Sequence, residues 1–156
     1  MSSAAVAEEI RCILIPLDRQ ALLLPNAAVA EIVDFHRLVS LQGLPDWVAG
    51  VTDWRQRRLA VVRFERLLGE PEARSQRRRI VVCHALDPQA KRPFIGLVSA
   101  AIPRLLRVHA GLLEGRPLAE DWRELPLHAA LTVDGREALI PDLPALAQRL
   151  SEVDLG

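Results

Sequence analysis

The chain has 156 residues, half of them apolar, and its 20 basic and 20 acidic side chains leave a formal net charge of zero. A chain of this length can bury a core as one domain without disulfides or metal. The balanced charge argues against disorder and against long-range attraction to nucleic acid. No apolar run approaches the ~20 residues that a membrane helix needs, and the N-terminal residues lack a signal-peptide pattern. We therefore expect a cytoplasmic protein without membrane insertion.

Short apolar runs that stop at turn residues predict strands along most of the chain. In chain order we expect strands at residues 11–17, 21–24, 29–33, 57–64, 80–86, 92–98, 105–108, 127–133 and 136–140. Residues 87–91 and the pair Asp134-Gly135 read as hairpin turns, the second because Asp-Gly suits a type I′ turn. This pattern indicates an all-β barrel or sandwich.

Two helical patterns interrupt the strands. Asp142 can cap a C-terminal helix, on which one face would carry Leu143, Leu146, Ala147 and Leu150. A shorter helix is expected over residues 64–69, before a glycine stop. The charged segment 70–79 predicts an exposed loop that separates two groups of strands, and hence two small β subdomains. Residues 111–125 predict a second irregular loop.

The sequence nominates no catalytic or metal site. Its cysteines and histidines lack metal-ligand spacing, and Cys83 and His84, as neighbours on an expected strand, point to opposite faces. No nucleophile elbow, dinucleotide-binding motif or Walker motif is present. We therefore expect neither an enzyme nor a bound metal or cofactor, and we interpret Cys12 and Cys83 as buried, reduced thiols.

The stretch GVTDWRQRRLAVVRF, residues 50–64, has three possible interpretations: a nucleic-acid patch, a catalytic loop or a protein-docking edge. Scarce aromatic residues disfavour the first, and the missing catalytic motifs disfavour the second. Tryptophan and arginine are enriched at binding hot spots. The alternative, of equal weight, is that Trp54 caps a barrel mouth while Arg55 faces solvent.

A larger pattern resembles the CheW-like domain of chemotaxis coupling proteins. Its parts in this chain are Leu24-Pro25, residues 29–33, Leu44-Pro45, residues 47–55 and the apolar strand that ends at Phe64. Residues 94–98 and 105–108 look like the second half of that domain. The resemblance covers about residues 10–150 as a single domain and leaves residues 1–9 as a flexible N-terminus.

The resemblance implies an all-β fold in which two small five-stranded barrels share a hydrophobic core and carry a C-terminal helix. It also implies a non-catalytic adaptor that couples the signalling tips of methyl-accepting chemoreceptors to the regulatory domain of a CheA-type histidine kinase, recruited to membrane-associated receptor arrays. Carried over by position, Val29 and Arg55 correspond to receptor-side residues, and Glu31 and Gly50 correspond to kinase-side residues.

The chain departs from the family's Asn-Leu-Arg-Gly motif at three positions, with Asp53 for asparagine, Trp54 for leucine and Gln56 for glycine. Loss of the glycine removes easy access to positive φ, so a changed turn geometry is expected, and Asp53 could pair with Arg55. Asp53 and Trp54 are candidate contacts of altered specificity.

These changes favour a divergent family member. Within the family, the chain looks most like the ChpC-type proteins of type IV pilus systems and twitching motility. The alternative is a CheW-like module with another partner, such as a response regulator or a pilus component.

Overall fold

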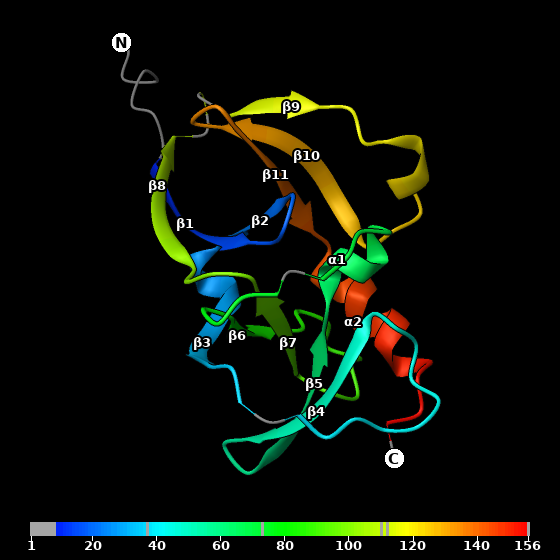
Figure 1. Cartoon of the computed structure of the whole chain (residues 1–156). Coiled ribbons are helices and arrows are strands. Elements are labelled where there is room, and N and C mark those ends of the chain that lie inside the picture. Colours follow the sequence, from blue (N-terminus) through cyan, green and yellow to red (C-terminus); the bar gives the residue numbers. More distant parts are fainter. Residues whose placement is uncertain (1–8, 37, 73, 110, 112, 156) are drawn as a thin grey trace.

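The computed structural model describes residues 9–36, 38–72, 74–109, 111 and 113–155. Two β-sheets, stacked one above the other in Figure 1, make up most of this part of the chain. We call the upper one sheet A and the lower one sheet B. The mostly-β fold with a C-terminal helix that the sequence predicted is confirmed.

Sheet A has six strands, formed by the two ends of the chain. They are β1 (Glu9–Pro16), β2 (Ala21–Pro25), β8 (Arg104–His109), β9 (Glu114–Arg116), β10 (Leu127–Val133) and β11 (Arg136–Pro141). Their order in the sheet is β8-β1-β2-β11-β10-β9. Neighbouring strands are antiparallel except β2 and β11, which run parallel and pair at Leu22 and Leu139.

Sheet B has five strands that follow one another in the sequence. They are β3 (Val29–Asp34), β4 (Val48–Trp54), β5 (Arg57–Val62), β6 (Arg79–His84) and β7 (Phe94–Ser99), in the order β3-β6-β7-β5-β4. Sheet B is thus inserted between β2 and β8 of sheet A. The expected boundary at residues 70–79 is therefore wrong, because that segment connects α1 to β6 within sheet B. Its charge reflects exposure to solvent and not a change of sheet.

Each of the nine predicted strands exists, with ends shifted by a few residues, and two further strands were missed. β4 lies in a stretch for which the sequence predicted no strand, and six of its seven residues are buried, so it has no alternating pattern. β9 has three exposed residues within the predicted irregular loop. It brings sheet A to six strands, where five were expected.

The helices agree well with the predicted ones. Helix α1 spans Phe64–Leu67 and begins at a residue expected to end a strand, while α2 spans Leu143–Ser151. Asp142 Oδ1 accepts a hydrogen bond from the Ala145 backbone N–H at 3.1 Å, which confirms the predicted cap. Two short 3-10 turns, Asn26–Ala28 and Glu120–Trp122, complete the regular structure.

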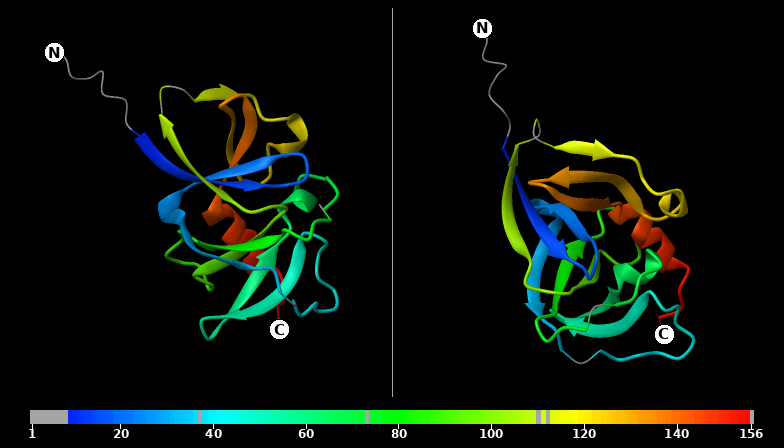
Figure 2. Two further views of the ribbon diagram at one scale, coloured as in Figure 1. Left: turned by 60° about the vertical axis from the view of Figure 1, so that its left-hand side comes forward. Right: turned by 45° about the horizontal axis from the view of Figure 1, so that its top comes forward.

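The two sheets share one hydrophobic core. Its main cluster includes Ile15 and Leu22 from sheet A, Val62 and Leu97 from sheet B, and Leu146 from α2. Figure 2 shows α2 lying where the sheets meet. The predicted apolar face of α2 supplies all of its buried side chains. The sheets are therefore not independent folding units.

Candidate functional site

The candidate site lies along a seam that closes sheet B. β3 and β4 are the two edge strands of the sheet, yet the chain just after β3 returns to β4. Val39 and Val51 exchange two backbone hydrogen bonds, at 2.8 and 2.9 Å. We call this contact zone the β3–β4 seam. It gives sheet B the barrel-like closure that the sequence predicted.

A histidine reinforces the seam. His36 Nδ1 lies 2.8 Å from the carbonyl oxygen of Asp34, and Nε2 lies 2.8 Å from Thr52 Oγ1. Because a carbonyl only accepts, Nδ1 carries the proton toward Asp34. In the neutral ring, Nε2 then accepts a hydrogen bond from the Thr52 hydroxyl. The polar side chains of the seam are thus mutually satisfied.

Trp54, at the end of β4, is buried. Its indole Nε1–H donates to Glu31 Oε1 at 3.0 Å, and its ring packs edge-on against Phe94 with 4.8 Å between centroids. Of the two interpretations left open for this tryptophan, the structure supports the one in which it caps the barrel. Trp54 would therefore affect the binding of a partner indirectly, by holding the side chains of Glu31 and Arg55 in place.

Arg55 lies in the turn between β4 and β5. The tip of this hairpin forms the lower edge of the molecule in Figure 1. One of its guanidinium nitrogens lies 3.0 Å from Glu31 Oε1, and its side chain remains 64% exposed. The guanidinium carbon also lies 4.8 Å from the centre of the Trp54 ring. The ion-pair partner of Arg55 is therefore Glu31 and not Asp53, which the sequence had suggested. Asp53 is exposed and lies opposite Arg58 in the ladder between β4 and β5.

The hairpin keeps a tight two-residue turn despite the lost glycine. Trp54 pairs with Arg57, and the residues between them, Arg55 and Gln56, have φ values of 48° and 63°. Positive φ at both central positions is the geometry of a type I′ turn. The turn thus has positive φ at Gln56 although glycine is absent there, and the strand pairing on both sides holds it in this conformation.

Val29 and Gly50, the other two residues assigned by resemblance, both lie within the ladders of sheet B. Val29 is half-buried and lies opposite Cys83 in the ladder between β3 and β6. Gly50 is buried at a β-bulge with φ of 148°, where an added Cβ would come 2.5 Å from the carbonyl oxygen of Val39. Any side chain at this position would clash with the backbone of the seam, so the seam requires glycine here.

All six predicted site residues thus lie on the two strands of the seam or at the turn that follows β4. Glu31 and Arg55, assigned by resemblance to different partners, are in direct contact. Sequence reasoning missed this contact, since the two residues are 24 positions apart, Glu31 on β3 and Arg55 in the turn after β4. The local sequence carries no sign of it.

Little in the described residues points to reaction chemistry. Within them, no group of three or more His, Cys, Asp or Glu side chains is placed to hold a metal ion. Cys83 is fully buried, and burial raises the pKa of its thiol to about 12, which makes it a poor nucleophile at neutral pH. In the same part of the chain, no helix is both long and apolar enough to cross a bilayer.

Comparison with known proteins settles the family. The profile described as the CheW-like domain matches residues 11–151, nearly the whole chain. The chain belongs to the CheW-like domain family. Comparison with curated proteins gave no match.

A solved structure agrees with this assignment. The scaffolding protein TtCheW from Thermoanaerobacter tengcongensis superimposes with a TM-score of 0.72 over 90% of this chain and 89% of its own. The identity is 14%, so this likeness supports the CheW-like fold alone. Residues 1–8 of the expected flexible N-terminus lie outside the described residues, and Glu9 already belongs to β1.

Proposed function

We propose that this chain is a non-catalytic adaptor of a chemosensory system, which couples chemoreceptors to a CheA-type histidine kinase. The observation that carries the proposal is the match to the CheW-like family over residues 11–151. Scaffolds of this family join receptors and CheA in general. A cytoplasmic location beside membrane-associated receptor arrays follows from the same proposal.

The β3–β4 seam is the proposed contact surface. Arg55 offers an exposed guanidinium at a hairpin tip, where its pair with Glu31 restricts its orientation. A guanidinium held in place loses less entropy when it meets a carboxylate of a partner. We assign Val29 and Arg55 to the receptor contact, and Glu31 and Gly50 to the kinase contact.

The receptor contact is tested with Arg55→Ala. We expect it to weaken binding of a receptor signalling-tip fragment by about 2 kcal/mol or more, as for a hot-spot residue, without loss of fold. Titration calorimetry measures this, with Arg107→Ala as a matched control, because Arg107 is an arginine of similar exposure on β8. Unchanged binding would show that Arg55 has no receptor role. Alanine is preferred to glutamate, which would repel Glu31.

The kinase contact is tested with Glu31→Gln, which keeps an acceptor for the Trp54 indole but removes the charge. A lysine at Gly50 would be unsuitable, because the Cβ alone would strike the backbone of Val39 and disturb the seam. We expect Glu31→Gln to reduce affinity for the regulatory domain of the kinase. Should the folded wild-type chain bind neither kinase nor receptor, the adaptor function is refuted.

A finer proposal concerns the pathway. Leu24–Glu31 and the Trp-Arg turn resemble the ChpC-type members, so we propose a type IV pilus system and twitching motility. Relative to the family motif, a buried Trp54 and an exposed Asp53 replace leucine and asparagine, and this change of side chains also favours the alternative of a response regulator or pilus component as partner. Affinity capture from the native lysate distinguishes these partners by mass spectrometry.

A further inference from the structure

A pocket of about 250 Å³ lies beside the β4–β5 hairpin. It shares Trp54 with the proposed contact surface, but its lining includes none of the four residues assigned to the receptor or the kinase. Residues of the hairpin line one wall, and the segment that leads into β7 lines the other. Four cations line it, namely Arg57, Arg58, Lys91 and Arg92, together with the rings of Trp54 and Phe94. We call it the cationic pocket.

The charge of this pocket is unbalanced. None of the described residues that line it is acidic, although the chain as a whole is neutral. Arg57 lies over the Phe94 ring at 5.5 Å. Two acids lie just outside the pocket lining: Asp53 is opposite Arg58 in the β4–β5 ladder, and Asp154 lines a neighbouring pocket together with Lys91 and Arg92. Clustered like charges repel one another, so the pocket favours a negatively charged ligand.

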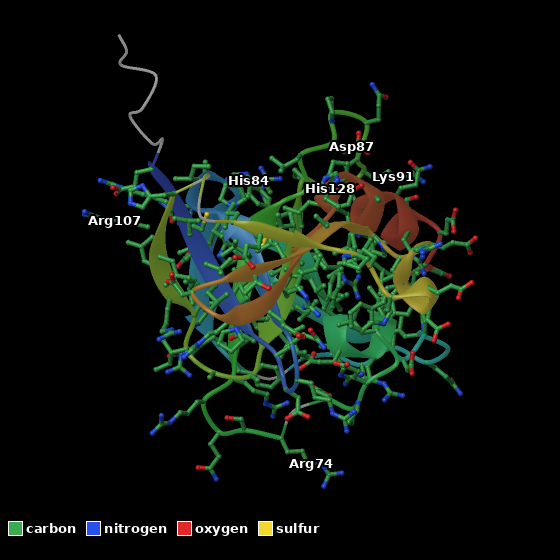
Figure 3. All side chains as sticks on the ribbon, turned by 90° about the horizontal axis from the view of Figure 1, so that it is seen from above. Arg74, His84, Asp87, Lys91, Arg107 and His128 are labelled. Carbon is green, nitrogen blue, oxygen red and sulfur yellow. The ribbon has the colours of Figure 1, made fainter. Side chains whose placement is uncertain are left out.

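A second basic groove, beside α1, provides the contrast. There Arg66 pairs with Asp46 at 2.8 Å, and Arg63 pairs with Glu72 at 2.9 Å. Acids within this groove thus neutralise much of its charge. Arg74 of the groove and Lys91 of the cationic pocket lie on opposite sides of the molecule in Figure 3. The two basic regions are separate. Among the described residues, the lining of the groove includes acids and the lining of the cationic pocket does not.

The walls also define the shape of the ligand. The Trp54 and Phe94 rings meet edge to face and provide an apolar surface, which suits an aliphatic side chain. The volume lies below the roughly 300–1,000 Å³ of small-molecule sites. No glycine and no helix N-terminus lines the pocket, whereas phosphate sites are typically built on such backbone N–H groups. These features favour a peptide over a nucleotide.

We propose that the cationic pocket binds an acidic peptide segment of a partner protein. Carboxylates of the segment pair with Arg58 and Lys91 at the exposed rim, and one apolar side chain packs on Trp54 and Phe94. This site goes beyond the proposed adaptor function, since neither Arg55 nor Glu31 lines it. Its test needs no receptor or kinase, so the two proposals can fail separately.

The experiment titrates the full chain into a fluorescein-labelled peptide of Asp and Glu residues around one Leu, read by fluorescence anisotropy. We expect saturable binding that Arg58→Ser/Lys91→Ser weakens roughly tenfold, as for two exposed charge pairs. The control Arg104→Ser/Arg123→Ser removes the same charge from exposed positions elsewhere, and we expect it to leave the affinity within about twofold. All four side chains are exposed, so both variants should fold.

Two further measurements test whether the apolar contact contributes and whether the pocket prefers a peptide to a nucleotide. A peptide with Ser in place of Leu should bind more weakly, because the apolar contact is lost. ATP should not displace the labelled peptide. The proposal is overturned if the wild-type chain shows no saturable binding, if both double variants weaken it equally, or if ATP binds in place of the peptide.

Discussion

At the scale of single residues, the β4–β5 turn is the most costly local conformation of the site. Arg55 and Gln56 both adopt positive φ without being glycine, which costs roughly 1–2 kcal/mol for an ordinary residue. The strand pairing on either side offsets this cost. The turn therefore holds Arg55 in one orientation, at some expense to the stability of the protein.

Replacing Gln56 with glycine should relieve part of this strain. We expect Gln56→Gly to raise the free energy of unfolding by up to about 1 kcal/mol, because glycine populates positive φ freely. Urea denaturation measures the change. The opposite substitution, Gly135→Ala, in the turn where Gly135 has a φ of 77°, should destabilise the protein. A less stable Gln56→Gly variant would contradict the strain argument.

Cys83 gives a prediction about pH. Burial raises its pKa from 9.0 to about 12, so between these values the unfolded chain loses a proton that the folded chain keeps. The free energy of unfolding should therefore be unaffected below pH 9 and fall above it, by at most about 1.4 kcal/mol per pH unit. The chain has no tyrosine and one lysine, so few other side chains titrate in this window.

Urea denaturation between pH 8 and 11 measures this decline in the free energy of unfolding. The control is Cys83→Ala, whose stability should fall less steeply with pH because the buried thiol is gone. Cys12 contributes in both proteins, since burial raises the pKa of its thiol too. Equal slopes for the two proteins would show that Cys83 does not control the alkaline stability.

At the scale of elements, helix α2 joins the sheets through one face. Leu146 is fully buried in the shared core, whereas Gln148 is exposed on the same helix. We expect Leu146→Ala to lower the free energy of unfolding by about 2–5 kcal/mol and Gln148→Ala to change it by less than about 0.5 kcal/mol. Thermal or urea unfolding distinguishes them. A small effect at Leu146 would mean that α2 is dispensable for the core.

The elements also show what a sequence pattern can predict. The Asp142 cap and the apolar face of α2 were readable because cap and periodicity are local signals. β4 was not, since burial on both faces removes the alternation that marks a strand. For the site, local composition singled out Trp54 and Arg55. The Glu31 contact that fixes both depends on the closure of sheet B, which no local pattern encodes.

At the scale of the whole molecule, the insertion of sheet B into sheet A should make folding cooperative. The shared core contains residues from both sheets and from α2. Differential scanning calorimetry should therefore show one transition with equal calorimetric and van't Hoff enthalpies, of about 110 kcal/mol at the midpoint for a chain of this length. Two resolved transitions would mean that the sheets unfold separately.

The parallel pairing of β2 with β11 has a further consequence for biosynthesis. Leu22 and Leu139 pair directly although they lie 117 positions apart. At about 5–20 residues per second, a ribosome needs on the order of 6–23 s to deliver the second strand after the first. During that interval, one edge of β2 has no strand partner, and the apolar core surface that α2 covers in the folded protein is exposed. Until β11 is synthesised, this edge has unpaired backbone groups that another chain could pair with, so the delay is a period of exposure to aggregation.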